Sequence, residues 1–118
     1  MLACFSPITS LEFIVYSETG SVHLLNLRSN IHRRLFESLS ITAIEYTSTG
    51  RQILMTLRDG TINLVDLNGN IKSVQKSSFH KGPINKIVTG NSDGVFMTVS
   101  NDMIALWSEV SLGKLAKM

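Results

Sequence analysis

DGTINLVDL, at residues 59–67, decides the fold, because a close copy of it, TGSVHLLNL, occupies residues 19–27. The glycines of the two copies, Gly20 and Gly60, lie about 40 residues apart. A looser third copy, DMIALWS, follows at residues 102–108. This period predicts a chain built from repeated supersecondary units of about 40 residues, each packed on its neighbours.

Each copy reads as a tight turn followed by a β-strand. Apolar and other side chains alternate after the turn, so that Ile62 and Leu64 belong to one face of the strand and Asn63 and Val65 to the other. The glycine of each turn supplies the positive φ that a tight hairpin needs. These features favour antiparallel strands joined by short hairpins.

The segments on either side of these copies repeat as well. In each unit, two successive apolar runs rich in Val, Ile, Thr and Phe come before the turn. Their composition is typical of β-strands. A fourth, more polar strand is predicted in each unit, near residues 32–36, 71–76 and 114–118. The sequence therefore predicts an all-β chain of three four-stranded antiparallel units, at about residues 1–38, 41–78 and 82–118.

At these residues the sequence resembles the WD-repeat family. DGTINLVD at residues 59–66 is similar to the family's Asp-Gly-Thr-Ile-x-Leu-Trp-Asp strand, with Val65 in place of the tryptophan. YTSTGRQIL at residues 46–54 resembles the family's aromatic-Ser-Pro-Asp-Gly-x-x-Leu segment. FHKGPI at residues 79–84 resembles the Gly-His start of a blade, with Phe79 in place of the glycine.

The resemblance implies an incomplete WD-repeat β-propeller of three blades that works as a protein-interaction scaffold. It also implies a structural hydrogen-bond tetrad of Asp, His, Ser or Thr, and Trp, which only the third unit can retain. Counting back from Trp107 places Asn101 at the aspartate position and leaves Asp102 one residue out of register. The expected remnant consists of His80, Thr98 or Ser100, Asn101 or Asp102, and Trp107.

Partners in this family often dock on the face formed by the second-to-third-strand turns and the loops between blades. On this sequence the corresponding partner-facing positions are Glu18, Arg58, Asn101, Lys81 and Asn85. Loops on a rigid scaffold commonly carry recognition. Solvated polar side chains without a partner are the simpler interpretation of each position.

Several constellations admit a catalytic or cofactor interpretation, and a structural one is preferred for each. His80, Ser100 and Asp102 have the residue types of a hydrolytic triad, but no G-x-S-x-G elbow is present. DLNGN at residues 66–70 lacks the glycine and glutamate spacing of a calcium loop. Residues 90–94 lack the Gly-Lys-Ser/Thr ending of a phosphate loop. We expect no enzyme activity, cofactor or metal.

The histidines and the single cysteine are interpreted in the same way. We expect His23, His32 and His80 to lie in different units, without the four ligands that a zinc site gathers. Cys4 belongs to a predicted inner strand, where a buried cysteine behaves as a small apolar group, and a reactive thiol is the alternative.

Composition narrows the range of partners and compartments. Eleven Lys and Arg against nine Asp and Glu give a formal charge of +2, and the basic residues are scattered, so nucleic acid is not an expected partner. One cysteine excludes an internal disulfide and fits a reducing compartment. No signal peptide or membrane-spanning run is recognised. We expect an intracellular, cytoplasmic protein.

Three units leave two outer faces uncovered, because propellers have four to eight blades. The missing blades of a longer parent chain, a second copy of this chain, or another protein's propeller could cover these faces. The leading expectation is a non-catalytic scaffold that docks other proteins in a multiprotein assembly. The alternative is a segment that completes or oligomerises into a propeller with a nucleic-acid-associated or regulatory role.

Overall fold

The computed structural model describes residues 2–38, 40–76, 80, 83–90, 94–109 and 111–117. Within these ranges the chain is all-β and has no helix, and its strands form three antiparallel sheets of four strands each. The predicted all-β class and the three four-stranded units are therefore confirmed.

Each sheet is a meander in which strands that are consecutive in sequence are paired. The first sheet contains β1 (Leu2–Phe5), β2 (Glu12–Tyr16), β3 (Ser21–Asn26) and β4 (Ile31–Glu37). The second contains β5 (Ile41–Tyr46), β6 (Gln52–Leu57), β7 (Thr61–Asp66) and β8 (Ile71–Lys76). The third contains β9 (Lys86–Thr89), β10 (Val95–Val99), β11 (Ile104–Ser108) and β12 (Lys114–Lys117). These sheets span residues 2–37, 41–76 and 86–117.

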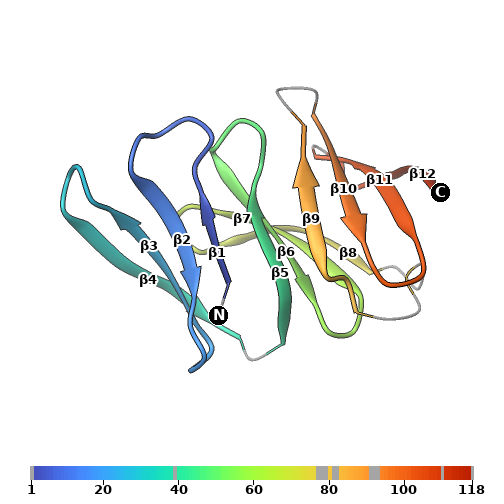
Figure 1. Ribbon diagram of the computed structural model, residues 1–118, viewed down its shortest axis with the longest axis horizontal. Coiled ribbons are helices and arrows are strands. Elements are labelled where there is room, and N and C mark those ends of the chain that lie inside the picture. The colour runs from blue at the N-terminus through green and yellow to red at the C-terminus, as the bar shows by residue number, and fades with distance from the viewer. Residues whose placement is uncertain are drawn as a thin grey trace.

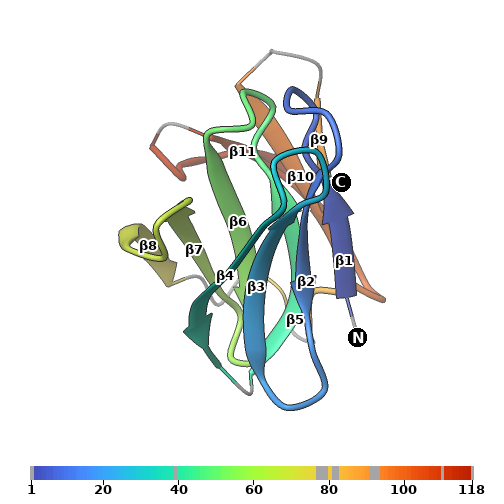
Figure 2. The ribbon, with the colours of Figure 1, turned by 90° about the vertical axis from the view of Figure 1, so that its left-hand side faces the viewer.

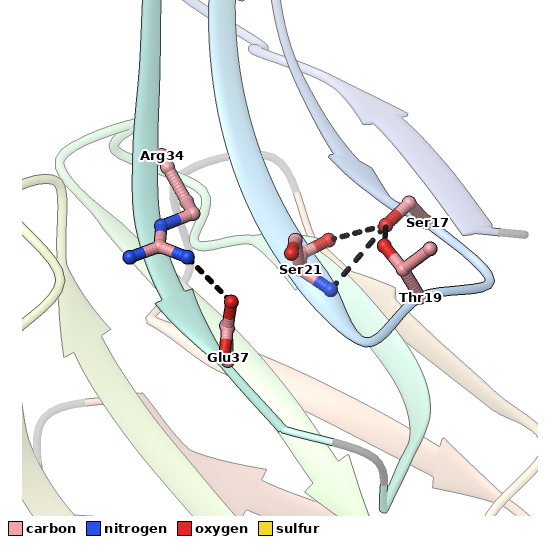
Figure 3. Close-up of polar contacts among 5 residues, drawn as sticks. All are labelled: Ser17, Thr19, Ser21, Arg34 and Glu37. Atoms are coloured by element: carbon pink, nitrogen blue, oxygen red, sulfur yellow. Dashed lines mark hydrogen bonds and ion pairs between the residues drawn. The ribbon is translucent and has the colours of Figure 1, made fainter.

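The hairpin turns follow from the residues that the repeat places there. Gly20 and Gly60 have φ values of 90° and 89°, a left-handed conformation that glycine adopts at low cost. In the β6–β7 turn the Thr61 N–H donates to Asp59 Oδ1 at 2.9 Å, which fixes the turn locally. In the β2–β3 turn the hydroxyls of Ser17 and Thr19 take this role, as Figure 3 shows.

The sheets lie side by side in chain order (Figure 1). β5 lies between β1 and β9, so that the first strands of the three sheets are neighbours. Figure 2 shows β8 on the opposite side of the molecule from β1 and β9. The fourth strands β4 and β8 are mostly exposed, as their polar composition predicts.

Two apolar clusters hold the sheets together. One joins the first and second sheets, with Ile14 and Leu24 packed against Tyr46, Ile53 and Val65. The other joins the second and third sheets around a second set of buried side chains, which includes Leu54, Ile62, Leu64, Phe96 and Trp107. The second sheet thus contributes Val65 to one cluster and Ile62 and Leu64 to the other, which is the alternation that the sequence predicts.

None of the described residues belongs to a helix long and apolar enough to cross a membrane.

Gly69, in the β7–β8 turn, is held against the first sheet. Its φ is +92°, and a Cβ there would lie 2.5 Å from the backbone oxygen of Leu35 in β4. Gly94 offers a matched comparison, because its φ is +70° but nothing lies within 4 Å of an added Cβ.

We predict that Gly69→Ala lowers the free energy of unfolding by at least about 3 kcal/mol, because left-handed strain and a backbone clash add together. Gly94→Ala carries the strain alone and should lose about 1 kcal/mol. Urea denaturation of both variants measures the difference. Equal losses would show that the contact between Gly69 and β4 is absent in solution.

Candidate functional site

A chain of buried hydrogen bonds in the third sheet centres on the His80 imidazole. His80 Nδ1 lies 2.7 Å from Ser100 Oγ, and His80 Nε2 lies 2.8 Å from Thr98 Oγ1. His80, Ser100 and Thr98 are all buried. Both ring nitrogens therefore have a hydroxyl partner, as buried polar groups require.

The chain continues at both ends. Trp107 Nε1–H donates to Thr98 Oγ1 at 2.8 Å, across the β10–β11 pair. The Ser100 hydroxyl donates to Asp102 Oδ1 at 2.6 Å, within the turn that joins the same two strands. Two strands, one turn and the segment before β9 are thereby linked through five side chains.

The donors and acceptors fix the imidazole tautomer. Because Ser100 has one hydroxyl proton and gives it to Asp102, the neighbouring His80 Nδ1 must donate to Ser100 Oγ. In the neutral ring Nε2 then accepts from the Thr98 hydroxyl. Burial lowers the pKa of His80 and so favours this neutral form, while the nearby Asp102 carboxylate acts in the opposite direction.

This order of groups is not the one that activates a serine nucleophile. A general base must accept the serine proton, whereas here His80 Nδ1 donates to Ser100 and the proton of Ser100 points to Asp102. His80 Nε2 is engaged by Thr98. The arrangement is suited to fixing strands and a turn in one geometry, because every member satisfies a neighbour.

Asn101 lies outside this chain of hydrogen bonds. Its Oδ1 accepts a hydrogen bond from Asn85 Nδ2 at 2.8 Å, and both residues are exposed. Asp102, one residue out of register with the other repeats, takes the acidic position instead. The irregular turn before β11 makes up this offset, which counting along the sequence cannot detect.

The first two sheets lack this chain of hydrogen bonds, because their residues at the corresponding positions are apolar. Strand register places Val15 and Met55 where the third sheet has Thr98, and Leu25 and Val65 where it has Trp107. Neither valine nor methionine can replace the threonine hydroxyl. Among the described residues, the third sheet alone has this chain of hydrogen bonds.

The predicted partner-facing positions lie at one edge of the molecule. Glu18 and Arg58 are exposed in the β2–β3 and β6–β7 turns, and Asn85 is exposed just before β9. These turns lie at the lower edge in Figure 1, together with the β10–β11 turn. Lys81 lies outside the described residues. No charged partner within the described residues is recorded for Glu18 or Arg58, and the nearest ion pair to the β2–β3 turn joins Arg34 to Glu37 (Figure 3).

Polar contacts between sheets were missed by the sequence analysis. The Tyr46 hydroxyl donates to Glu12 Oε2 at 3.0 Å, between the second and first sheets. Ser48 donates its backbone N–H and its hydroxyl to the two carboxylate oxygens of buried Glu109, at 3.0 and 2.7 Å, between the second and third sheets. Glu109 lies in the turn after β11, and no sequence motif pairs it with Ser48.

The prediction that the three histidines lie in different units is wrong for two of them. His23 in β3 and His32 in β4 are neighbours on the first sheet, with His23 Nδ1 3.0 Å from His32 Nε2. His32 is paired with Leu25, two residues along β3 from His23, so the two imidazoles are diagonal neighbours on the same face of the sheet. Within the described residues no group of three or more His, Cys, Asp or Glu side chains could hold a metal ion.

Cys4 is buried in β1 and packs in the cluster between the first and second sheets. Burial raises the pKa of its thiol to about 12, and the neighbouring Glu45 acts in the same direction. Burial likewise raises the pKa of the Glu45 carboxyl. A thiol in this setting is protonated at neutral pH and is a poor nucleophile, as the apolar interpretation of Cys4 expects.

No model of a known protein family matches the sequence, and the search of curated proteins finds no match.

We predict that Thr98→Val lowers the free energy of unfolding by about 2–4 kcal/mol, because buried groups of both His80 and Trp107 lose their partner. Thr42→Val is the matched control, since Thr42 makes one part-buried hydroxyl pair with Thr56, and it should lose about 1 kcal/mol. Urea denaturation at pH 7.5 measures both. Similar losses would mean that the hydrogen bonds centred on His80 do not form.

The lowered pKa of His80 has a consequence for stability against pH. Unfolding returns His80 to its ordinary pKa of 6.5, so below that pH the unfolded chain binds more protons than the folded chain. We predict that stability falls as the pH drops from 7.5 to 5.5, and that His80→Gln reduces the slope. An unchanged slope in a folded His80→Gln variant would contradict the assignment to His80.

Proposed function

We propose that this chain is a non-catalytic protein-interaction scaffold, a three-blade wedge of a WD-repeat-like β-propeller that docks other proteins in a multiprotein assembly. Three meandering sheets with neighbouring first strands support the architecture. The hydrogen bonds that link Asp102, Ser100, His80, Thr98 and Trp107 support the likeness to the WD repeat, because they join the residue types of that family's tetrad.

The observation that carries the proposal is the apolar character of both outer sheet faces. On the first sheet, the outer face contains Ala3, Val15 and His23 in one row and Phe5, Phe13 and Leu25 in the next. Phe5 is 72% exposed, and its ring centroid lies 5.5 Å from that of Phe13. The counterparts of Phe5 and Phe13 in the second sheet, Tyr46 and Ile53, are fully buried against the first sheet.

The outer face of the third sheet has the same character. Val88, Met97 and Leu106 form one row across β9, β10 and β11, and they line a shallow apolar hollow. Leu54 and Leu64, their counterparts in the second sheet, are 0% and 4% exposed because the third sheet covers them. At both internal boundaries, an apolar face of this kind is buried against the neighbouring sheet.

Apolar side chains gathered on a partly exposed sheet face mark a contact surface, since burial removes their apolar area from water. We infer that further blades cover both faces, from the same parent chain or from a second copy. The edge formed by the β2–β3, β6–β7 and β10–β11 turns then presents polar side chains such as Glu18 and Arg58 to partner proteins, on a framework that the sheets keep rigid.

Self-association of the 118-residue chain tests the proposal. We predict that the chain forms dimers or larger species in light scattering, and that Phe13→Glu or Met97→Glu shifts it towards monomer by placing a charge on one outer face. Val74→Glu is the control, because Val74 is already 50% exposed on β8 and belongs to neither outer face.

Circular dichroism should show that all three variants keep their β-structure. A chain that stays monomeric over a wide range of concentration, with both apolar faces in water, would overturn the proposal. An equal effect of Val74→Glu would show that association does not use the outer faces.

A further inference from the structure

A pair of imidazoles lies on the outer face of the first sheet. His23 in β3 and His32 in β4 are diagonal neighbours across the β3–β4 hairpin. His23 Nδ1 lies 3.0 Å from His32 Nε2, and the two ring centroids are 5.1 Å apart. His23 is half-buried and His32 is exposed, so that solutes can reach the pair.

The side chains beside the pair are apolar. Val15 and Leu25 line a shallow hollow together with the two imidazoles. Val15 is paired with His23 across β2 and β3, and Leu25 is paired with His32 across β3 and β4. Neither offers a polar side-chain atom that would compete for the facing ring nitrogens. The two imidazoles therefore interact with each other.

The separation of the two facing nitrogens suits a shared metal ion. A zinc–imidazole bond is about 2.0–2.1 Å long. Two such bonds place their nitrogens about 2.9 Å apart at a right angle, as in a square-planar site, and about 3.3 Å apart at a tetrahedral angle. The 3.0 Å between His23 Nδ1 and His32 Nε2 lies between these values. The hairpin thus already holds two ligands at the spacing of a chelate.

We propose that His23 and His32 form a two-imidazole binding site for a divalent transition-metal cation, with Cu²⁺ bound more tightly than Zn²⁺. Imidazole nitrogen suits both ions, and Cu²⁺ stands above Zn²⁺ in the general order of affinities. Among the described residues no third His, Cys, Asp or Glu joins the pair, so water completes the coordination in the isolated chain. The site does not depend on the proposed scaffold function.

Metal binding requires a change of tautomer in one ring. In the neutral pair, one of the two facing nitrogens carries a hydrogen and donates it to the other. When both nitrogens coordinate the ion, that proton moves to the outer nitrogen of its own ring, which is His23 Nε2 or His32 Nδ1. Both rings stay neutral, and no net proton is released.

A positive charge on the same face limits the affinity. Arg34 is paired with His23 in the β3–β4 ladder, so the two side chains belong to one face of the sheet. The Arg34 guanidinium forms an ion pair with Glu37, which offsets part of its charge (Figure 3). Water and salt screen the repulsion between Arg34 and a bound dication, so we expect it to weaken binding only a few fold.

Calorimetric titration of the full chain at pH 7.5, in a buffer that does not coordinate metals, measures the affinity. We expect Cu²⁺ to bind with a dissociation constant of roughly 1–10 μM and Zn²⁺ to bind at least about tenfold more weakly. Mg²⁺ should not bind, because it prefers oxygen ligands. His32→Gln should weaken Cu²⁺ binding at least about tenfold, and the double variant His23→Gln, His32→Gln defines the background from the rest of the chain.

NMR of the histidine ring nitrogens locates the ion. Zn²⁺ should shift the signals of His23 Nδ1 and His32 Nε2, which coordinate it. His80 serves as an internal control, because its two ring nitrogens are already engaged by Ser100 and Thr98. The His80 signals should therefore stay unchanged.

A matched pair of charge variants tests the position of the ion. Arg34→Gln should tighten Cu²⁺ binding about two- to fivefold at low salt, because it removes a positive charge beside His23. Lys72→Gln is the control, since Lys72 also forms an exposed ion pair, with Asp66, but belongs to the second sheet. It should leave the affinity unchanged.

Three results would overturn the inference, provided that circular dichroism shows each variant to be folded. The first is Cu²⁺ binding by the original chain no tighter than that of the double variant, which would mean that the two imidazoles only bond to each other. The second is full affinity in His32→Gln. The third is an equal effect of Arg34→Gln and Lys72→Gln, which would place the ion elsewhere.

Discussion

Stacking of apolar sheet faces is the interaction on which the rest of this structure depends. Each sheet is apolar on both sides, so no sheet can bury its side chains alone. The second sheet is covered on both sides, with Val65 and Tyr46 buried against the first sheet and Leu54 and Leu64 against the third. The first and third sheets meet it on one side only. The same constraint therefore explains the two internal clusters and the two outer faces that need a cover.

Polar contacts add specificity to this stacking. The bond from Tyr46 to Glu12 and the paired bonds from Ser48 to Glu109 cross the two sheet boundaries, where apolar packing alone would tolerate sliding. Burial raises the pKa of the Tyr46 hydroxyl further above its ordinary range, and acceptance of its bond by Glu12 acts in the same direction, so it stays a donor. These contacts hold one sheet at a defined height against the next.

The repeat made the strands, the hairpins and the alternation of faces predictable, since each depends on local spacing of apolar residues and glycine. The members of the hydrogen-bond chain could also be predicted from the sequence, because Trp107 and His80 stand at repeat positions. That Asp102 and not Asn101 joins it could not be predicted, because this depends on an irregular turn. The contact between His23 and His32 depends on hairpin register, and that between Ser48 and Glu109 on the stacking of two sheets. Neither leaves a local pattern in the sequence.

Departures from the repeat carry as much structural information as the repeat itself. In the third sheet Trp107 and Thr98 fill and bond the space beside the preceding sheet. In the second sheet Val65 and Met55 leave part of that space open, and the side-chain oxygen of Asn63 is buried without a hydrogen-bond partner among the described residues. A loss of packing alone would account for a smaller side chain at position 65, but it would not account for a buried amide two residues away. The buried Asn63 oxygen without a partner adds a polar penalty to the lost packing, so this sheet boundary is less well satisfied than the one that Trp107 fills.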